Sequence, residues 1–240
     1  MHGAAFVTTH WSVVLAAGRS DTPRAKEALS KLCQTYWYPL YAYARARGYG
    51  REDAQDLTQE FFARLLEKNW IGSAEREKGR FRSFLLTVMK RFLADEWDKA
   101  RAEKRGGGVP LLSLEFDTAE RRLRHEPADE VTPERSFERR WALTLLGEVL
   151  KQLQEENERE GNAELFAELN PCLIGERTSL PYTELAKKLA LSESAVKSAV
   201  HRLRQRYRKL LRKEIAQTVA TPGEVDDELR HLLAVLGKKG

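Results

Sequence analysis

The clearest structural pattern in the chain lies in Tyr182–Lys213, which reads YTELAKKLALSESAVKSAVHRLRQRYRKLLRK. Its spacing predicts two helices crossing at a short turn, a helix-turn-helix. Ser192 can accept hydrogen bonds from free amides at the start of the second helix, and Glu193 suits the positive end of its dipole. Ala190 holds the turn position where glycine is preferred, so we expect a left-handed alanine that costs about 1–2 kcal/mol. The apolar and small residues at the required spacing are Leu185, Ala186, Leu189, Leu191, Val196 and Ala199.

Basic residues gather on one side of the second predicted helix. Between residues 182 and 213, ten Lys and Arg residues against two Glu residues give a local charge of +8, above the +5 of the whole chain. A charged arc of mixed sign is usually the solvated side of a surface helix, but here one sign dominates. Such an arc suits a helix in the major groove, where basic side chains bind phosphate and early side chains reach base edges. The candidate DNA-binding residues are Ser194, Lys197, Ser198, His201, Arg202 and Gln205.

An acidic stripe is expected on an earlier helix. Asp53, Asp56, Glu60 and Glu67 are separated by near-integral helical turns and therefore share one narrow face. Beside them runs an apolar stripe. The acids alone fit a solubilising face or a docking surface for a basic partner. Metal binding or acid–base catalysis is a weaker interpretation, because no His or Cys accompanies the carboxylates.

The next predicted helix, from about Phe81 to Arg105, carries the opposite sign. Ten basic and five acidic residues between 76 and 105 give +5. Trp97 lies off the apolar arc, and both base stacking and packing against the preceding helix are open for it. The residues of that arc, which we expect to pack rather than to stack on bases, are Phe81, Phe84, Leu85, Val88 and Phe92.

The remaining sequence indicates an all-α fold of two helical domains. The break at residues 106–110 (GGGVP) separates them. Thr132-Pro133-Glu134 restarts a helix, because Thr can cap it, Pro fits its first position and Glu complements the dipole. We expect a first domain at residues 1–105, a linker at 106–131, a second domain at 132–215 and a C-terminal extension at 216–240.

The extension is predicted to form an amphipathic helix from Val225 to Leu236. Thr221 and Glu224 have the spacing of a capping box, and apolar residues follow at helical intervals. We expect this helix to dock rather than to stay free. Two positions are open for it, one over the basic arc of the second domain, where it would inhibit DNA binding, and one on the core side of that domain.

The bulk composition excludes several classes. The 240 residues show no apolar run of membrane-spanning length and no secretory signal within Met1–Thr9, so we expect a cytoplasmic protein without a membrane partner. Cys33 and Cys172 are far apart and lack neighbours at ligand spacing, which predicts buried thiols rather than a zinc site or a disulfide. We expect no catalytic residues, no cofactor and no metal.

Three segments together resemble those of extracytoplasmic-function sigma factors, the group IV initiation factors of bacterial RNA polymerase. Residues 53–65 (DAQDLTQEFFARL) resemble conserved region two, which binds the β′ clamp helices. Residues 81–86 (FRSFLL), followed by Asp95, resemble the promoter-melting part of that region. Residues 182–186 with 196–204 resemble region four, which reads the minus-thirty-five element. The resemblance covers residues 30–105 and 136–213 in the family's order.

The resemblance implies a sigma factor that directs core polymerase to promoters. Its partners would be RNA polymerase core, through the β′ clamp helices and the β flap, and promoter DNA; an anti-sigma factor or inhibition by the chain's own C-terminal helix are further options. Lys197, Ser198, His201 and Arg202 match region-four readers of bases and phosphates. The loop from Gly72, with the helix after it, would hold the melted minus-ten strand, which makes Arg80, Arg82, Lys90 and Arg91 candidate DNA contacts. Asp53, Asp56, Gln59 and Glu60 would bind the clamp.

The sequence departs from the family pattern in several places. Arg91 stands where many relatives have Asn. The loop before Phe81 and the stretch Ala163–Leu180 are both longer than is common in the family, and the C-terminal helix is an addition. These departures indicate a divergent subgroup. The alternatives are a conventional helix-turn-helix regulator, a nucleic-acid enzyme with an appended DNA-binding domain, and a structural adaptor.

Overall fold

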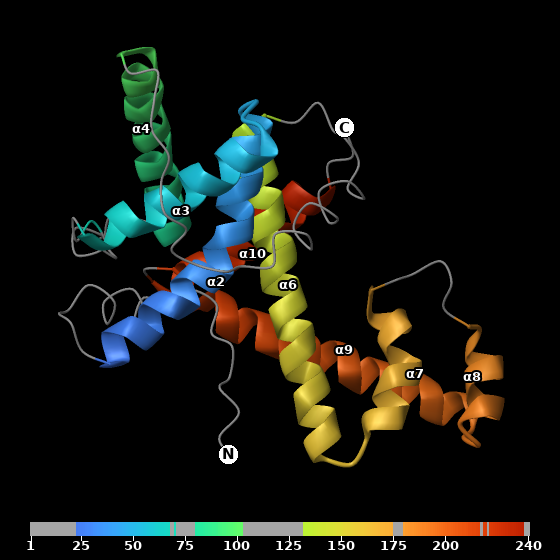
Figure 1. The fold of residues 1–240 in the computed structure, drawn as a ribbon. Coiled ribbons are helices and arrows are strands. Elements are labelled where there is room, and N and C mark those ends of the chain that lie inside the picture. The colour runs from blue at the N-terminus through green and yellow to red at the C-terminus, as the bar shows by residue number, and fades with distance from the viewer. Residues whose placement is uncertain are drawn as a thin grey trace. The chain divides into compact units, whose positions relative to one another are not determined.

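The computed structural model describes residues 23–67, 70, 80–102, 132–174, 180–216, 218–219 and 221–237. Within these ranges the chain forms helices and no strands, which confirms the all-α prediction (Figure 1). The predicted linker at 106–131 and the loop at 72–79 lie outside the described residues. Contacts divide the chain into two units. The first joins Val7–Leu145 to Ile215–Gly240, and the second holds Leu146–Glu214.

The first unit contains α2 (Pro23–Ala46), α3 (Arg51–Glu67), α4 (Phe81–Ala102), the first half of α6 (Pro133–Arg159), and the C-terminal η3 (Pro222–Glu224) and α10 (Val225–Gly237). The boundary between units falls inside α6. The first half of α6 therefore belongs with residues that the sequence assigned to a different domain. The tail helix begins and ends within one residue of its expected limits, which confirms that prediction.

Aromatic side chains fill the core of the first unit. Tyr36 of α2 meets Phe81 of α4 edge to face at 5.7 Å between ring centroids, and Phe61 of α3 meets Phe92 of α4 at 5.7 Å. Such edge contacts add to the free energy of simple burial. Phe81, Leu85 and Phe92 are buried, so the packing role predicted for this arc is confirmed for them.

Local turns and caps define where several of these helices begin and end. After α2, Gly48 takes a φ of +93°, and Arg45 donates to the Tyr49 carbonyl at 2.9 Å, which ends the helix before α3 starts. At the start of α6 the Thr132 hydroxyl accepts from the Arg135 amide at 3.4 Å, as the sequence predicted. The capping box of the tail differs from prediction. The Thr221 hydroxyl bonds to the Glu224 carboxylate at 3.1 Å, and a 3₁₀ turn precedes α10.

The second unit contains the rest of α6, α7 (Ala163–Ile174), α8 (Tyr182–Lys188) and most of α9 (Glu193–Ala216). The stretch after Ala163, which is longer than is common in the family, is thus largely the helix α7. Its residues Phe166, Leu169 and Cys172 are buried. Arg204 of α9 donates to the Cys172 carbonyl at 2.8 Å and so satisfies a backbone acceptor near the end of α7. Helix α7 is therefore packed into this unit as a regular structural element.

Candidate functional site

The acidic stripe of α3 is solvent-facing. Asp53, Asp56 and Glu60 are exposed, while Ala54 and Phe61 on the adjacent side are fully buried. This arrangement follows from the helical period, which places acids on one face and the apolar seam on the other. A carboxylate surface of this kind can bind a basic partner through charge complementarity.

Gln59 does not share that exposure. Gln59 is only 7% exposed. The neighbouring Thr58 is buried, and its hydroxyl donates a hydrogen bond to the Ala54 carbonyl at 2.6 Å. The structure therefore separates Gln59 from the three acids with which the resemblance grouped it. Gln59 lies beneath the exposed face, so a partner that binds this face would contact Asp53, Asp56 and Glu60 rather than Gln59.

Glu60 is held in position by a neighbour. Arg64 donates to it at 2.7 Å and to Glu96 of α4 at 2.7 Å, and the guanidinium lies 5.1 Å from the centre of the Phe92 ring. The Arg64 side chain is one-fifth exposed. Arg64 thus links α3 to α4 and orients one carboxylate of the stripe.

The two cations at the start of α4 that the sequence proposed as DNA contacts have partners within the chain. Arg82, predicted to contact DNA, is 2% exposed and lies over the Trp141 ring at 4.2 Å. It donates to Glu138 of α6 at 2.8 Å and forms a two-pronged ion pair with Glu228 of α10. Arg80 also reaches Glu228, at 2.7 Å. Both predicted DNA contacts are therefore occupied by carboxylates of the chain itself.

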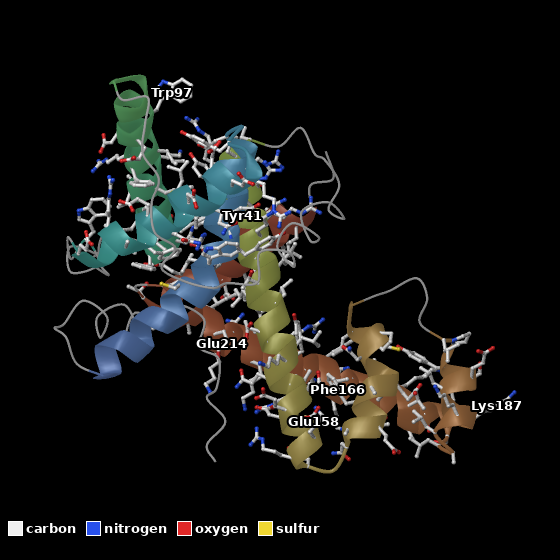
Figure 2. All side chains as sticks on the ribbon, in the orientation of Figure 1. Tyr41, Trp97, Glu158, Phe166, Lys187 and Glu214 are labelled. Carbon is white, nitrogen blue, oxygen red and sulfur yellow. The ribbon has the colours of Figure 1, made fainter. Side chains whose placement is uncertain are left out.

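Further along α4, the predicted cations are accessible. Arg91 is exposed, and Lys90 is about half exposed while pairing with Glu134 at 2.8 Å. The hydrogen bond from Lys90 lowers the pKa of Glu134. Trp97 is 59% exposed and projects at the far end of the helix (Figure 2). Packing against the preceding helix, one of the two options for Trp97, would have buried the ring.

The helix-turn-helix has the predicted local geometry. Ala190 has a φ of 52°, which confirms the left-handed alanine at the turn. The Ser192 hydroxyl accepts from the Ala195 amide at 3.2 Å, which confirms its capping role for α9. The buried residues that join α8 to α9 are Leu185, Ala186, Val196, Ala199 and Val200.

The outer arc of α9 is exposed at every residue that the sequence selected. Lys197 pairs with Glu193 one turn earlier at 2.6 Å, and the His201 ring bonds to Gln205 at 2.8 Å. Both contacts lie on the helix surface and leave the groups in reach of a ligand. The predicted set that the structure brings to one exposed face is Ser194, Lys197, Ser198, His201, Arg202 and Gln205.

Other basic residues of this unit have structural partners. Arg206 binds Glu156 of α6 through two parallel bonds at 2.7 and 2.8 Å, and Lys188 of α8 pairs with Glu168 of α7 at 2.7 Å. Part of the +8 charge counted in the sequence is therefore matched within the unit. The exposed arc at the start of α9 offers basic and hydroxyl side chains that can meet DNA.

The comparisons with known proteins agree with this geometry in the first unit. Residues 32–103 match the model of sigma-70 region 2. The matched range spans most of α2 and all of α3 and α4, and so includes the acidic stripe and the cations of α4. No curated protein and no solved structure matches the chain.

Among the residues that the structure describes, no three or more His, Cys, Asp or Glu residues are grouped so that they could hold a metal ion. No described helix is long and apolar enough to cross a membrane. Cys33 and Cys172 are buried free thiols, as the sequence predicted, and burial raises the pKa of Cys33 to about 12.

Sequence reasoning missed the partners of Arg82. Glu228 is fully buried, which the sequence analysis did not predict. A signal for this exists, since Glu228 lies three residues after Val225 and four before Leu232, on the buried side of α10. A carboxylate on an apolar face is almost never buried without a partner. The nearby His231, bonded to Glu138 at 3.0 Å, was missed as well.

Proposed function

We propose that the protein is a sigma factor of the extracytoplasmic-function type, which binds RNA polymerase core, directs it to promoters and catalyses no reaction itself. The observation that carries this proposal is the match of residues 32–103 to sigma-70 region 2, together with the exposure of the acidic stripe on α3 within that range. Core binding would use Asp53, Asp56 and Glu60. The partner surface would be the β′ clamp helices.

Promoter recognition would use both units. The exposed arc of α9 supports binding in the major groove. Side chains near the start of the helix would contact the edges of the nucleobases, and the basic side chains that follow would contact phosphates. In the first unit, Arg91 and Lys90 are placed to meet backbone phosphate, and exposed Trp97 can stack on an unpaired base. The second contact surface on polymerase would be the β flap, and the site of action the cytoplasm.

The test is binding of the purified protein to core polymerase. The double variant Asp56→Lys, Glu60→Lys should abolish binding while helix content stays unchanged, because reversed charges repel a basic docking surface. Exposed pairs such as Glu60–Arg64 contribute little to folding, typically under about 1 kcal/mol. The matched control is Glu158→Lys, Glu160→Lys, which makes the same charge change on exposed residues outside the region-two match.

Two outcomes would contradict the proposal. If the folded Asp56, Glu60 variant binds core as well as the wild type, the acidic stripe is not the docking surface. If neither the wild type nor the control binds core, the protein is not a sigma factor, and the alternative to test is a conventional helix-turn-helix regulator.

A further inference from the structure

The helix α10 carries a fully buried carboxylate into the part of the region-two match that we assign to DNA. Glu228 is 0% exposed, and its two oxygens are divided between Arg82 and Arg80 at the start of α4. Glu138 of α6 takes the remaining side of Arg82 at 2.8 Å and also bonds to His231 of α10. The C-terminal helix therefore holds two guanidinium groups from within the chain.

A guanidinium group binds carboxylate and phosphate by the same planar, two-pronged geometry. The donors that Arg82 and Arg80 give to Glu228 are therefore the donors that a nucleic-acid backbone would need. One carboxylate and one phosphate cannot occupy them together.

The apolar side of α10 is only partly covered. Val225 and Leu232 are buried, Leu229, Val235 and Leu236 are half-buried, and Leu233 is 64% exposed. The helix has 13 residues, a length at which an isolated helix is marginal in water. A released α10 would therefore unfold rather than remain as a free helix.

We propose that α10 is an autoinhibitory latch whose Glu228 occupies Arg80 and Arg82 until single-stranded nucleic acid displaces it. The proposal rests on the proposed function, because a melted strand would reach these two cations only if the protein opens promoter DNA as a sigma factor. It places the inhibitory contact in the first unit, whereas the sequence had suggested the basic arc of α9. Coupling between α10 and nucleic acid must be reciprocal, so each weakens the binding of the other.

The first experiment measures binding of a fluorescein-labelled, 12-nucleotide single-stranded DNA to the full chain by fluorescence anisotropy. A single strand lacks the major groove that α9 requires. Glu228→Gln keeps the shape of the side chain but removes its charge, while Arg82 keeps Glu138. The control Asp227→Asn removes a charge from the neighbouring exposed residue, whose partner Arg230 lies on the same helix.

The latch predicts that Glu228→Gln binds the strand about 5–150-fold more tightly than the wild type, the range usual for coupled sites. Asp227→Asn should stay within about twofold, the change expected from one screened surface charge. Equal or weaker binding by folded Glu228→Gln shows that α10 is a structural brace and overturns the proposal. A gain of the same size in both variants would overturn it too, because net charge alone would then explain the effect.

A second measurement uses the wild type alone and so does not depend on how the variant folds. Hydrogen exchange of residues 225–237 is followed with and without saturating single-stranded DNA. Release predicts at least tenfold faster exchange in α10 on DNA binding, and unchanged or slower exchange overturns the latch. Core polymerase binding is measured in parallel. If the latch predictions fail while the protein binds core polymerase, the proposed function stands and only the latch is overturned. If the protein does not bind core polymerase, the proposed function is overturned. The hydrogen-exchange result then still decides whether α10 and nucleic acid compete.

Discussion

The left-handed alanine between α8 and α9 gives a stability prediction whose sign and size follow from one dihedral angle. Ala190 has a φ of 52°, a conformation that costs an L-residue about 1–2 kcal/mol and glycine almost nothing. Replacing alanine by glycine also makes the unfolded chain more flexible, which opposes the gain by about 0.4–1 kcal/mol. Ala190→Gly should therefore raise the free energy of unfolding by about 0.5–1 kcal/mol.

The assay is native-state hydrogen exchange of the slowest amides of α8 and α9 in the full chain, which reports the unfolding free energy of that unit. Ala199→Gly serves as the control, because this residue lies inside α9 and is 8% exposed. There glycine should lower stability by at least about 1 kcal/mol. A loss of stability in Ala190→Gly comparable with the control would refute the account of the turn.

Three further predictions concern packing, thiol chemistry and DNA recognition. Phe61→Ala should cost about 3–5 kcal/mol in urea unfolding, because the ring is fully buried against Phe92; a loss under about 1 kcal/mol would contradict this core. Since burial raises the pKa of Cys33 to about 12, its thiol should stay protonated and resist iodoacetamide at pH 8 until urea exposes it; fast labelling of the native protein would show an open site. His201→Ala with Arg202→Ala should weaken binding to duplex promoter DNA at least tenfold, from about 1–3 kcal/mol per base contact; undiminished binding would mean that α9 is not the reading helix.

Local signals in the sequence predicted local structure well. The cap at Ser192, the strained turn at Ala190 and the restart at Thr132-Pro133 depend on neighbours in the chain, so residue type and spacing determine them. The exposed arc of α9 followed from the helical period for the same reason. Among the acids of α3, the period placed Asp53, Asp56 and Glu60 correctly on the exposed side.

What the sequence did not predict are contacts between residues far apart in the chain. Arg82 and Glu228 are separated by 146 positions, and no local pattern pairs a particular cation with a particular acid at that distance. The sequence therefore proposed a DNA contact for Arg82 without its carboxylate partners, and it placed the tail on the helix-turn-helix domain, whereas the ion pairs of α10 are made with α4 and α6 of the first unit. The burial of Gln59 was not predicted for a related reason, since the width of the buried side of α3 depends on how its neighbours pack.

Run-off transcription with purified core polymerase, from a template that carries the DNA upstream of the protein's own coding sequence, shows whether the protein directs polymerase to a promoter. A sigma factor that docks through the acidic stripe should give a discrete transcript that requires the protein, disappears with Asp56→Lys, Glu60→Lys and persists with the charge-matched control Glu158→Lys, Glu160→Lys. A transcript of equal intensity with the folded Asp56, Glu60 variant, or no protein-dependent transcript from any template that the protein binds, would show that the protein does not act in this way.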